Sequence, residues 1–146
     1  MCRLLRLAWV SPVTLVGLVI VLFARVSGGE TRRVDGVLES AGGWPAGLLR
    51  RGLPFSGPVE ALTLGHAVIG VSAASLARTR AHERVHVRQF ERWGILMLAL
   101  YPLAGCLAWI RGGDPYRDNW FEREARAGAS ALQPQGVDSG SGAIER

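Results

Sequence analysis

The segment Thr79–Gln89, with the sequence TRAHERVHVRQ, contains the pattern His82-Glu83-x-x-His86. Residues four apart lie on one face of an α-helix, so both imidazoles can reach a single metal ion. Glu83 lies about 100° around the helix from His82, beside such an ion, where a base takes a proton from a metal-activated water. The spacing therefore predicts a zinc hydrolase site. The alternative is a solvated, arginine-rich helix with two surface histidines.

The surrounding residues predict the helix that this pattern needs. The segment Ser72–Trp93 contains no proline or glycine and is rich in alanine, leucine, arginine and glutamate, which are good helix formers. We expect Ser75 or Thr79 to cap the helix and Gly94 to end it.

A catalytic zinc usually has three protein ligands and an open position for water. One further ligand therefore has to come from elsewhere in the chain. The best carboxylates are Glu122 and Glu124, at the start of a helix that Asn119 is expected to cap. Asp114 and Asp118 lie in predicted turns and are poorer candidates.

Glu122 and Glu124 are two residues apart, so on a helix they point about 200° away from each other. Only one of them can therefore face His82 and His86. Phe121 and Ala125 form an apolar stripe that can pack against the metal helix, and both glutamates adjoin this stripe. The helix geometry alone does not choose between them.

The two motifs together resemble the gluzincin-type zincin metallopeptidases, in which His-Glu-x-x-His is followed by a glutamate on a later helix. The segment Tyr116–Ala125, YRDNWFEREA, is similar to the Asn-x-Phe-Glu-x-Glu-Ala segment of a group of small, largely uncharacterised bacterial metallopeptidases. The resemblance covers about Thr63–Ala127.

The resemblance implies that His82, His86 and Glu122 bind Zn²⁺ and that Glu83 is the general base. Its Glu-x-x-Ala pattern favours Glu122 as the third ligand and leaves Glu124 as the alternative. Gluzincins often place an aspartate or asparagine four residues after the third ligand, where it orients a histidine. Arg126 stands at that position here.

Two long apolar runs suggest a membrane. Residues 7–24, LAWVSPVTLVGLVIVLFA, carry no charge, which is at the short end for a membrane span. Because Ala24-Arg25-Val26 is a poor cleavage site, we expect an uncleaved anchor and not a signal peptide. Residues 94–110 are interrupted by Pro102 and Gly105, and are predicted to form a short second span or a kinked core helix.

Between the anchor and the metal helix, glycines and prolines separate short apolar pieces, which is typical of strands and turns. The Asp35-Gly36 pair predicts a hairpin within Arg32–Glu39. Residues 42–45 and 50–58 are predicted turns. The segment Val59–Val71 is predicted as one strand, or as two joined at Gly65, that forms a wall of a substrate cleft. His66 in this segment is a candidate site residue, and the alternative, which we favour, is a polar histidine near a strand bend.

The charge is basic but dispersed. All 17 basic residues are arginines, and the net charge is +5. They are spread along the chain and do not gather with aromatic residues, so a nucleic-acid partner is not expected. Anionic lipid headgroups suit this charge better. The two cysteines, Cys2 and Cys106, indicate neither a disulfide framework nor a cysteine metal site.

These observations predict an α+β protein with a zincin-like metal helix, a few short strands, an N-terminal membrane anchor and a second apolar helix. Residues 1–26 are the predicted anchor or signal-like segment, 27–127 the metallopeptidase domain and 128–146 a disordered tail.

The predicted function is a zinc-dependent peptidase that acts on a peptide or protein at a membrane, with the bacterial inner membrane expected. His66 and Tyr116 are candidate donors to the transition state. One alternative is a non-catalytic, zinc-stabilised membrane module that binds a partner protein. Another is a metal-free protein that binds anionic lipid. The sequence does not fix the oligomeric state.

Overall fold

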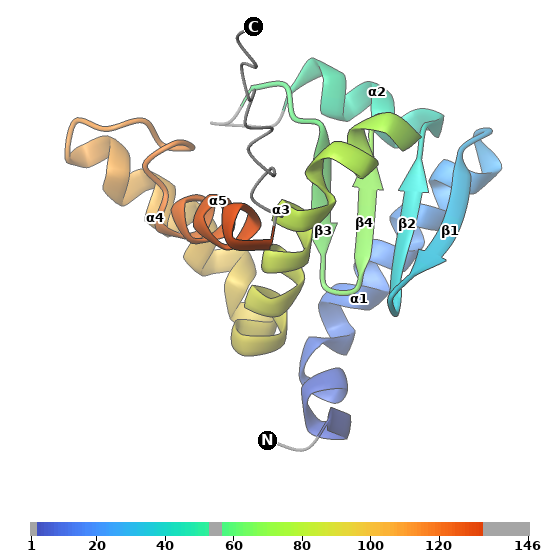
Figure 1. Cartoon of the computed structure of the whole chain (residues 1–146), viewed down its shortest axis with the longest axis horizontal. Helices are drawn as coiled ribbons and strands as arrows, with labels where there is room; N and C mark the ends of the chain where they lie inside the picture. Colours follow the sequence, from blue (N-terminus) through green and yellow to red (C-terminus); the bar gives the residue numbers. More distant parts are fainter. Residues whose placement is uncertain (1–2, 53–56, 133–146) are drawn as a thin grey trace, which may run out of the picture.

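The structure is a computed structural model, and it describes residues 3–52 and 57–132 (Figure 1). In chain order the elements are α1 (Arg3–Val26), β1 (Glu30–Val34), β2 (Val37–Ala41), α2 (Gly43–Arg51), β3 (Ala61–Leu64), β4 (Ala67–Gly70), α3 (Ala73–Trp93), the 3-10 helix η1 (Gly94–Leu96), α4 (Met97–Ile110) and α5 (Trp120–Leu132). The predicted α+β class is confirmed, and the zincin-like fold stays a prediction.

The four strands form one mixed sheet in the order β1-β2-β4-β3, in which only the central β2–β4 pair is parallel. Asp35 and Gly36, both with positive φ, make the turn between β1 and β2, as the sequence predicts. The segment Val59–Val71 contains two strands, because the chain reverses at Gly65 and His66.

Helices cover both faces of the sheet. Ala67 and Ile69 of the central strand β4 pack with Val21 of α1, whereas Val68 packs with Val87 of α3. Successive strand residues point to opposite faces, so α1 and α3 lie on opposite sides. Figure 1 shows α1 passing behind the strands and α3 in front of them.

Helix α1 contributes buried residues to the core from Val10 to Ala24. Its buried side shows helical spacing and consists of Val10, Val13, Gly17, Val21 and Ala24. The boundary predicted at residue 26 coincides with the last residue of α1, and the division into an anchor and a domain stays a prediction. By length and composition alone, two helical stretches of the described chain can cross a membrane, Ala8–Val26 and Ala73–Ile110.

Helix α3, which carries His82 and His86, begins directly after its cap, Ser72. The Ser72 hydroxyl accepts from the Ser75 N–H at 3.1 Å, and the Ser75 hydroxyl accepts from the Ser72 N–H at 2.9 Å. This reciprocal pair satisfies two helix N–H groups, so the prediction of Ser75 or Thr79 as the cap was wrong. Gly94 ends the helix as predicted.

Two other boundaries differ from the predictions. The turn predicted at residues 42–45 is mostly helix, because α2 starts at Gly43. Pro45 lies in the first turn of α2, where proline is tolerated. Part of the turn predicted over 50–58, residues 53–56, lies outside the described residues.

At the C-terminal end, α5 continues to Leu132, past the predicted start of the tail at Gly128. A Cβ at Gly128 would lie 2.8 Å from a methyl carbon of Val85, so glycine lets α5 approach α3 closely there. Residues 133–146 of the predicted tail lie outside the described residues.

Candidate metal centre

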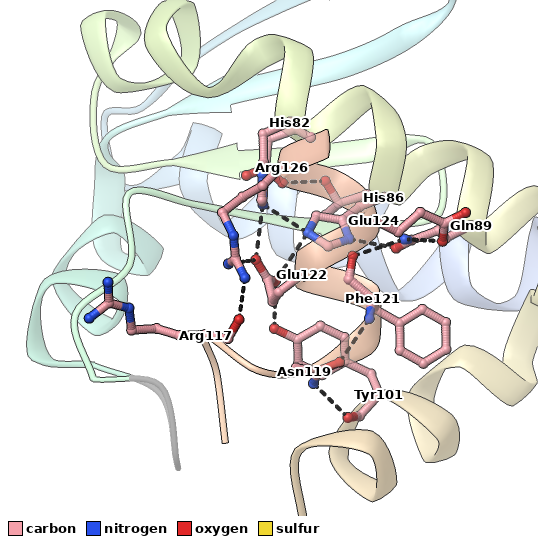
Figure 2. A network of polar contacts seen from close by, with 12 residues as sticks. His82, His86, Gln89, Tyr101, Arg117, Asn119, Phe121, Glu122, Glu124 and Arg126 are labelled. Atoms are coloured by element: carbon pink, nitrogen blue, oxygen red, sulfur yellow. Dashed lines mark hydrogen bonds and ion pairs between the residues drawn. The ribbon is translucent and has the colours of Figure 1, made fainter. Parts of the chain in front are cut away.

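Three predicted ligands converge between α3 and α5. His82 and His86 lie one turn apart on α3, and Glu122 lies in the first turn of α5 (Figure 2). The Nε2 atoms of His82 and His86 each lie 3.2 Å from an oxygen of Glu122, and 3.1 Å from each other. This group could hold a metal ion.

The start of α5 is fixed by contacts that bring Glu122 to the histidines. Phe121 and Ala125 are buried, and Phe121 packs in a cluster with Phe90 of α3. The Asn119 side chain accepts from the Phe121 N–H at 3.0 Å and donates to the Tyr101 carbonyl at 3.0 Å. Asn119 therefore caps α5, as predicted, and also ties it to α4.

Asp114 and Asp118 shape the loop before α5. The Asp114 carboxylate accepts the backbone N–H groups of Tyr116 and Arg117 at 2.9 and 2.6 Å, and the Asp118 carboxylate accepts that of Asp114 at 2.7 Å. Neither belongs to the group that could hold a metal.

The donor atoms fit a cation. Among the described residues, Glu122 Oε2 is buried without a hydrogen-bond partner, because its 3.2 Å contact with His82 lacks hydrogen-bond geometry. Such an oxygen calls for an explanation. Two imidazoles that face each other through Nε2, together with a carboxylate oxygen, make a donor set that suits zinc and other divalent transition metals.

Gln89 fixes the tautomer of His86. Its two amide N–H groups donate to Glu124 Oε2 at 2.8 Å and to the Phe121 carbonyl at 3.0 Å. Both partners are acceptors, so the amide oxygen is the atom that lies 2.8 Å from His86 Nδ1. His86 Nδ1 therefore carries the proton, and Nε2 is free to bind a metal.

This network distinguishes the two candidate glutamates. Glu122 faces the histidines, whereas Glu124 is the partner of Gln89 on the far side of His86 (Figure 2). Gln89 was missed in the sequence, although its position three residues after His86 on the same helix was visible. Its two partners come from α5, which the sequence pattern does not place.

Glu122 is also held by Tyr101 of α4, whose hydroxyl donates to Oε1 at 2.7 Å. Burial raises the pKa of Glu122, but the neighbouring imidazoles of His82 and His86 and the hydrogen bond from Tyr101 outweigh it and hold that pKa well below its usual range. The carboxylate is therefore ionised at neutral pH. The sequence alone gave no sign that Tyr101 contributes here.

Glu83 lies beside this group and is 6% exposed. The Thr63 hydroxyl of β3 donates to Glu83 Oε2 at 2.6 Å, which fixes the carboxylate across the space between β3 and α3. Thr63 is a second residue that the sequence pattern did not indicate.

The group opens into a cleft of about 240 Å³. Its polar end holds His82, Glu83, His86 and Glu122, and its other walls are mainly apolar residues of β3 and α4. The prediction that a strand before the metal helix forms one wall of a cleft is confirmed, because all four residues of β3 line it.

The two predicted donors are placed differently. Tyr116 lines the cleft, and burial with the nearby charges of Glu122 and Glu83 raises its pKa to about 12, so its hydroxyl stays protonated at neutral pH. His66 lies in the β3–β4 turn, where its Nε2 is 3.0 Å from Glu91 Oε1. It is not among the residues that line the cleft, so the structure does not bring it into the site.

Arg126 lies next to the third candidate ligand. One guanidinium nitrogen is 3.9 Å from Glu122 Oε2, and another donates to the Arg117 carbonyl. Arg126 thus bridges Glu122 and the preceding loop. The residue that contacts and orients His86 is Gln89 and not Arg126.

Comparison of the chain with protein-family models, with curated proteins and with solved structures found no match. The resemblance to gluzincin-type metallopeptidases rests on the two sequence motifs and stays a prediction.

Proposed function

We propose that this protein is a zinc-dependent peptidase. The observation that carries the proposal is the position of Glu83, which lines the same cleft as the three-residue group and is held there by Thr63. His82, His86 and Glu122 would hold the metal. When bound, zinc supplies a Lewis acid that polarises a carbonyl oxygen and lowers the pKa of a water molecule.

The residues of the cleft supply the proton transfers. Glu83 takes a proton from water as the water oxygen attacks the carbonyl carbon of the substrate. It then gives that proton to the amide nitrogen as the carbon–nitrogen bond breaks. Tyr116, which stays protonated at neutral pH, donates a hydrogen bond to the carbonyl oxygen as negative charge develops on it.

A peptide substrate fits the walls of the cleft. β3 is an edge strand of the described sheet and pairs only with β4. Its free edge presents backbone N–H and C=O groups to which an extended peptide can add as a further strand. The apolar residues Leu62, Leu64 and Leu98 around the cleft accommodate an apolar substrate side chain.

The test compares two substitutions on α3, Glu83→Gln and Glu91→Gln. Glu91 pairs with His66 outside the cleft and is the matched control. We expect Glu83→Gln to keep its metal, measured by elemental analysis, and to lower hydrolysis of a fluorogenic peptide mixture by about 100-fold or more. Glu91→Gln should retain both metal and activity. Equal activity of the two variants would overturn the proposal.

The second candidate is a zinc-stabilised membrane module without catalysis. It is favoured by the fact that the group joins two elements, α3 and α5, that are far apart in the chain. Such a module would tolerate Glu83→Gln but would unfold when His82 or His86 is replaced, because metal binding and folding are coupled. Thermal unfolding of Glu83→Gln and His86→Ala, with and without a chelator, separates the two candidates.

A further inference from the structure

Large apolar side chains are exposed on the two helices that lie behind the rest of the molecule. Figure 1 shows α1 behind the sheet and α4 behind α5. At least 59% of each of the following is exposed: Leu15, Leu22 and Phe23 of α1, and Leu103, Trp109 and Ile110 of α4. Helix α1 contacts η1, which leads directly into α4, where the Trp9 ring lies against Gly94. Exposed apolar surface of this extent marks an interaction site.

Charge at the helix ends identifies a lipid bilayer as the occupant. No charged residue occurs within residues 7–24 or 94–110. Exposed arginines stand at the boundaries of these runs, Arg25 after the first, Arg92 before the second and Arg111 after it. Trp9 and Trp109 are also exposed near the helix ends. Arginine and tryptophan flanking an apolar surface match the phosphate headgroups and the interface of a bilayer.

Helix α4 also forms a wall of the cleft, which connects this surface to the metal centre. Leu98 and Pro102 line the cleft, and both are exposed. Leu103, the next residue along α4, belongs to the apolar surface described above. An apolar chain can therefore pass from that surface over Leu98 into the cleft without crossing a charged group of α4.

We propose that the substrate is a peptide with a bilayer-embedded apolar segment next to the cleaved bond, which enters the cleft across Leu98 of α4. This proposal rests on the peptidase function proposed above. It adds the substrate class and the direction of entry, both of which follow from the continuity of the α4 surface with the cleft wall.

The first measurement asks whether the entrance lies in lipid and does not depend on activity. The full chain, with Cys2 and Cys106 replaced by serine, receives a fluorophore at Leu98→Cys, Leu107→Cys or Leu132→Cys and is mixed with phosphatidylethanolamine–phosphatidylglycerol vesicles. Leu107 is exposed on α4 outside the cleft, and Leu132 is exposed at the end of α5. We expect lipids brominated in their acyl chains to quench the labels at 98 and 107, but not at 132. Absence of quenching at 98 overturns the proposal.

The second measurement compares two fluorogenic peptides with the same cleavable sequence, one of which carries a membrane-spanning apolar segment in the vesicles. We expect the zinc-loaded protein to cleave the anchored peptide with a kcat/KM about tenfold higher or more, because anchoring raises its local concentration at the entrance. Leu98→Gln should remove this preference, whereas Leu107→Gln should keep it.

Each outcome bears on a different claim. Equal cleavage of the two peptides overturns the substrate class and leaves the peptidase function standing. Loss of the preference in Leu107→Gln as strong as in Leu98→Gln overturns entry across Leu98. Cleavage of neither peptide by the zinc-loaded protein overturns the peptidase function, and the substrate class with it.

Discussion

Two buried glutamates, each 2% exposed, lie on opposite sides of α3 and are satisfied in different ways. Glu39 of β2 accepts from Arg80 of α3 through both oxygens, at 2.9 and 3.1 Å, and from Arg32 at 3.0 Å. Glu122 of α5 faces His82 and His86 and keeps one oxygen without a hydrogen bond among the described residues. Arg80, which contacts Glu39, and His82, which contacts Glu122, are two positions apart on α3 and therefore point about 200° apart around the helix.

The two sites differ in whether the neighbouring side chains supply hydrogen-bond donors or metal-binding lone pairs. A guanidinium presents only N–H donors, so Arg80 and Arg32 complete the Glu39 site without any further group. An imidazole whose Nδ1 carries the proton offers a lone pair at Nε2, so His86 presents a ligand atom where Arg80 presents a donor. The Glu39 cluster therefore holds α3 to the sheet, whereas the Glu122 group keeps ligand atoms that could bind a cation.

The largest expected effect is on metal binding. Glu122→Ala removes a carboxylate from the group, and we expect it to weaken zinc by more than about 100-fold, beyond what loss of an outer partner causes. Zinc titration with a competing chelator measures the change. Glu39→Gln is the matched control, since it removes an equally buried charge on the other side of α3 and should keep zinc affinity unchanged. Equal loss in both variants would remove the distinction between the two sites.

The next effect is on stability, and here Glu39 is the residue that is tested. Glu39→Gln should lower the free energy of unfolding of the metal-free protein by about 2 kcal/mol, because it leaves Arg80 without its partner. This figure is below that for a fully buried ion pair, since the Arg32 and Arg80 side chains are 48% and 33% exposed. Urea denaturation measures it.

The same substitution predicts a pH dependence. Burial raises the pKa of Glu39, but Arg80 and Arg32 lower it by more, so the net shift is below the ordinary value of 4.5. A lowered pKa in the folded state contributes stability above the unfolded value, and that contribution is lost as the pH falls below it. The native protein should therefore lose more stability below about pH 4.5 than Glu39→Gln does. Parallel pH curves for the two proteins would contradict the pairing.

The contrast also shows what the sequence can predict. The placing of His82, Glu83 and His86 around one point was predictable from their spacing on one helix. The turn at Asp35-Gly36 was predictable from those two residues alone. Membership of Glu122 in the group depends on how α5 packs across α3, which helix geometry left open and only the family resemblance favoured. Local patterns cannot reveal a partnership between distant elements.

Helix α1 shows a different limit. An uncharged run of 18 residues is typical both of a membrane anchor and of a core helix with one exposed apolar side. Its buried side is defined by distant elements packed against it, because Val13 clusters with Phe90 of α3 and Val21 with Ile69 of the sheet. Gln89 illustrates the same point for a single residue. Its acceptors Phe121 and Glu124 lie 32 and 35 positions further along the chain.

A smaller effect is expected at Gln89. Gln89→Leu removes the acceptor for His86 Nδ1–H, so the imidazole loses the contact that fixes its tautomer and orientation. Zinc affinity should fall by about 10–100-fold, which is less than for Glu122→Ala. Zinc titration gives the affinity, and ¹⁵N chemical shifts of the imidazole of the metal-free protein report the tautomer, which a purely structural defect would not shift. An unchanged tautomer in Gln89→Leu would contradict the role given to this residue.

The smallest effect is expected at Glu124, which acts on the metal through two intervening residues. Glu124→Ala removes one acceptor from the Gln89 amide, but the Phe121 carbonyl still accepts its other N–H, and His86 Nδ1 still lies against its oxygen. Because Glu124 is only half-buried, water can replace its carboxylate. We therefore expect zinc affinity to fall by less than about tenfold, the lower bound for outer partners. The zinc affinity of Glu124→Gln, whose amide oxygen can still accept a hydrogen bond, should fall less than that of Glu124→Ala. If Glu124→Ala loses zinc while Glu122→Ala retains it, the third ligand is Glu124. Glu122 would then resemble Glu39, because its protein neighbours alone would satisfy it.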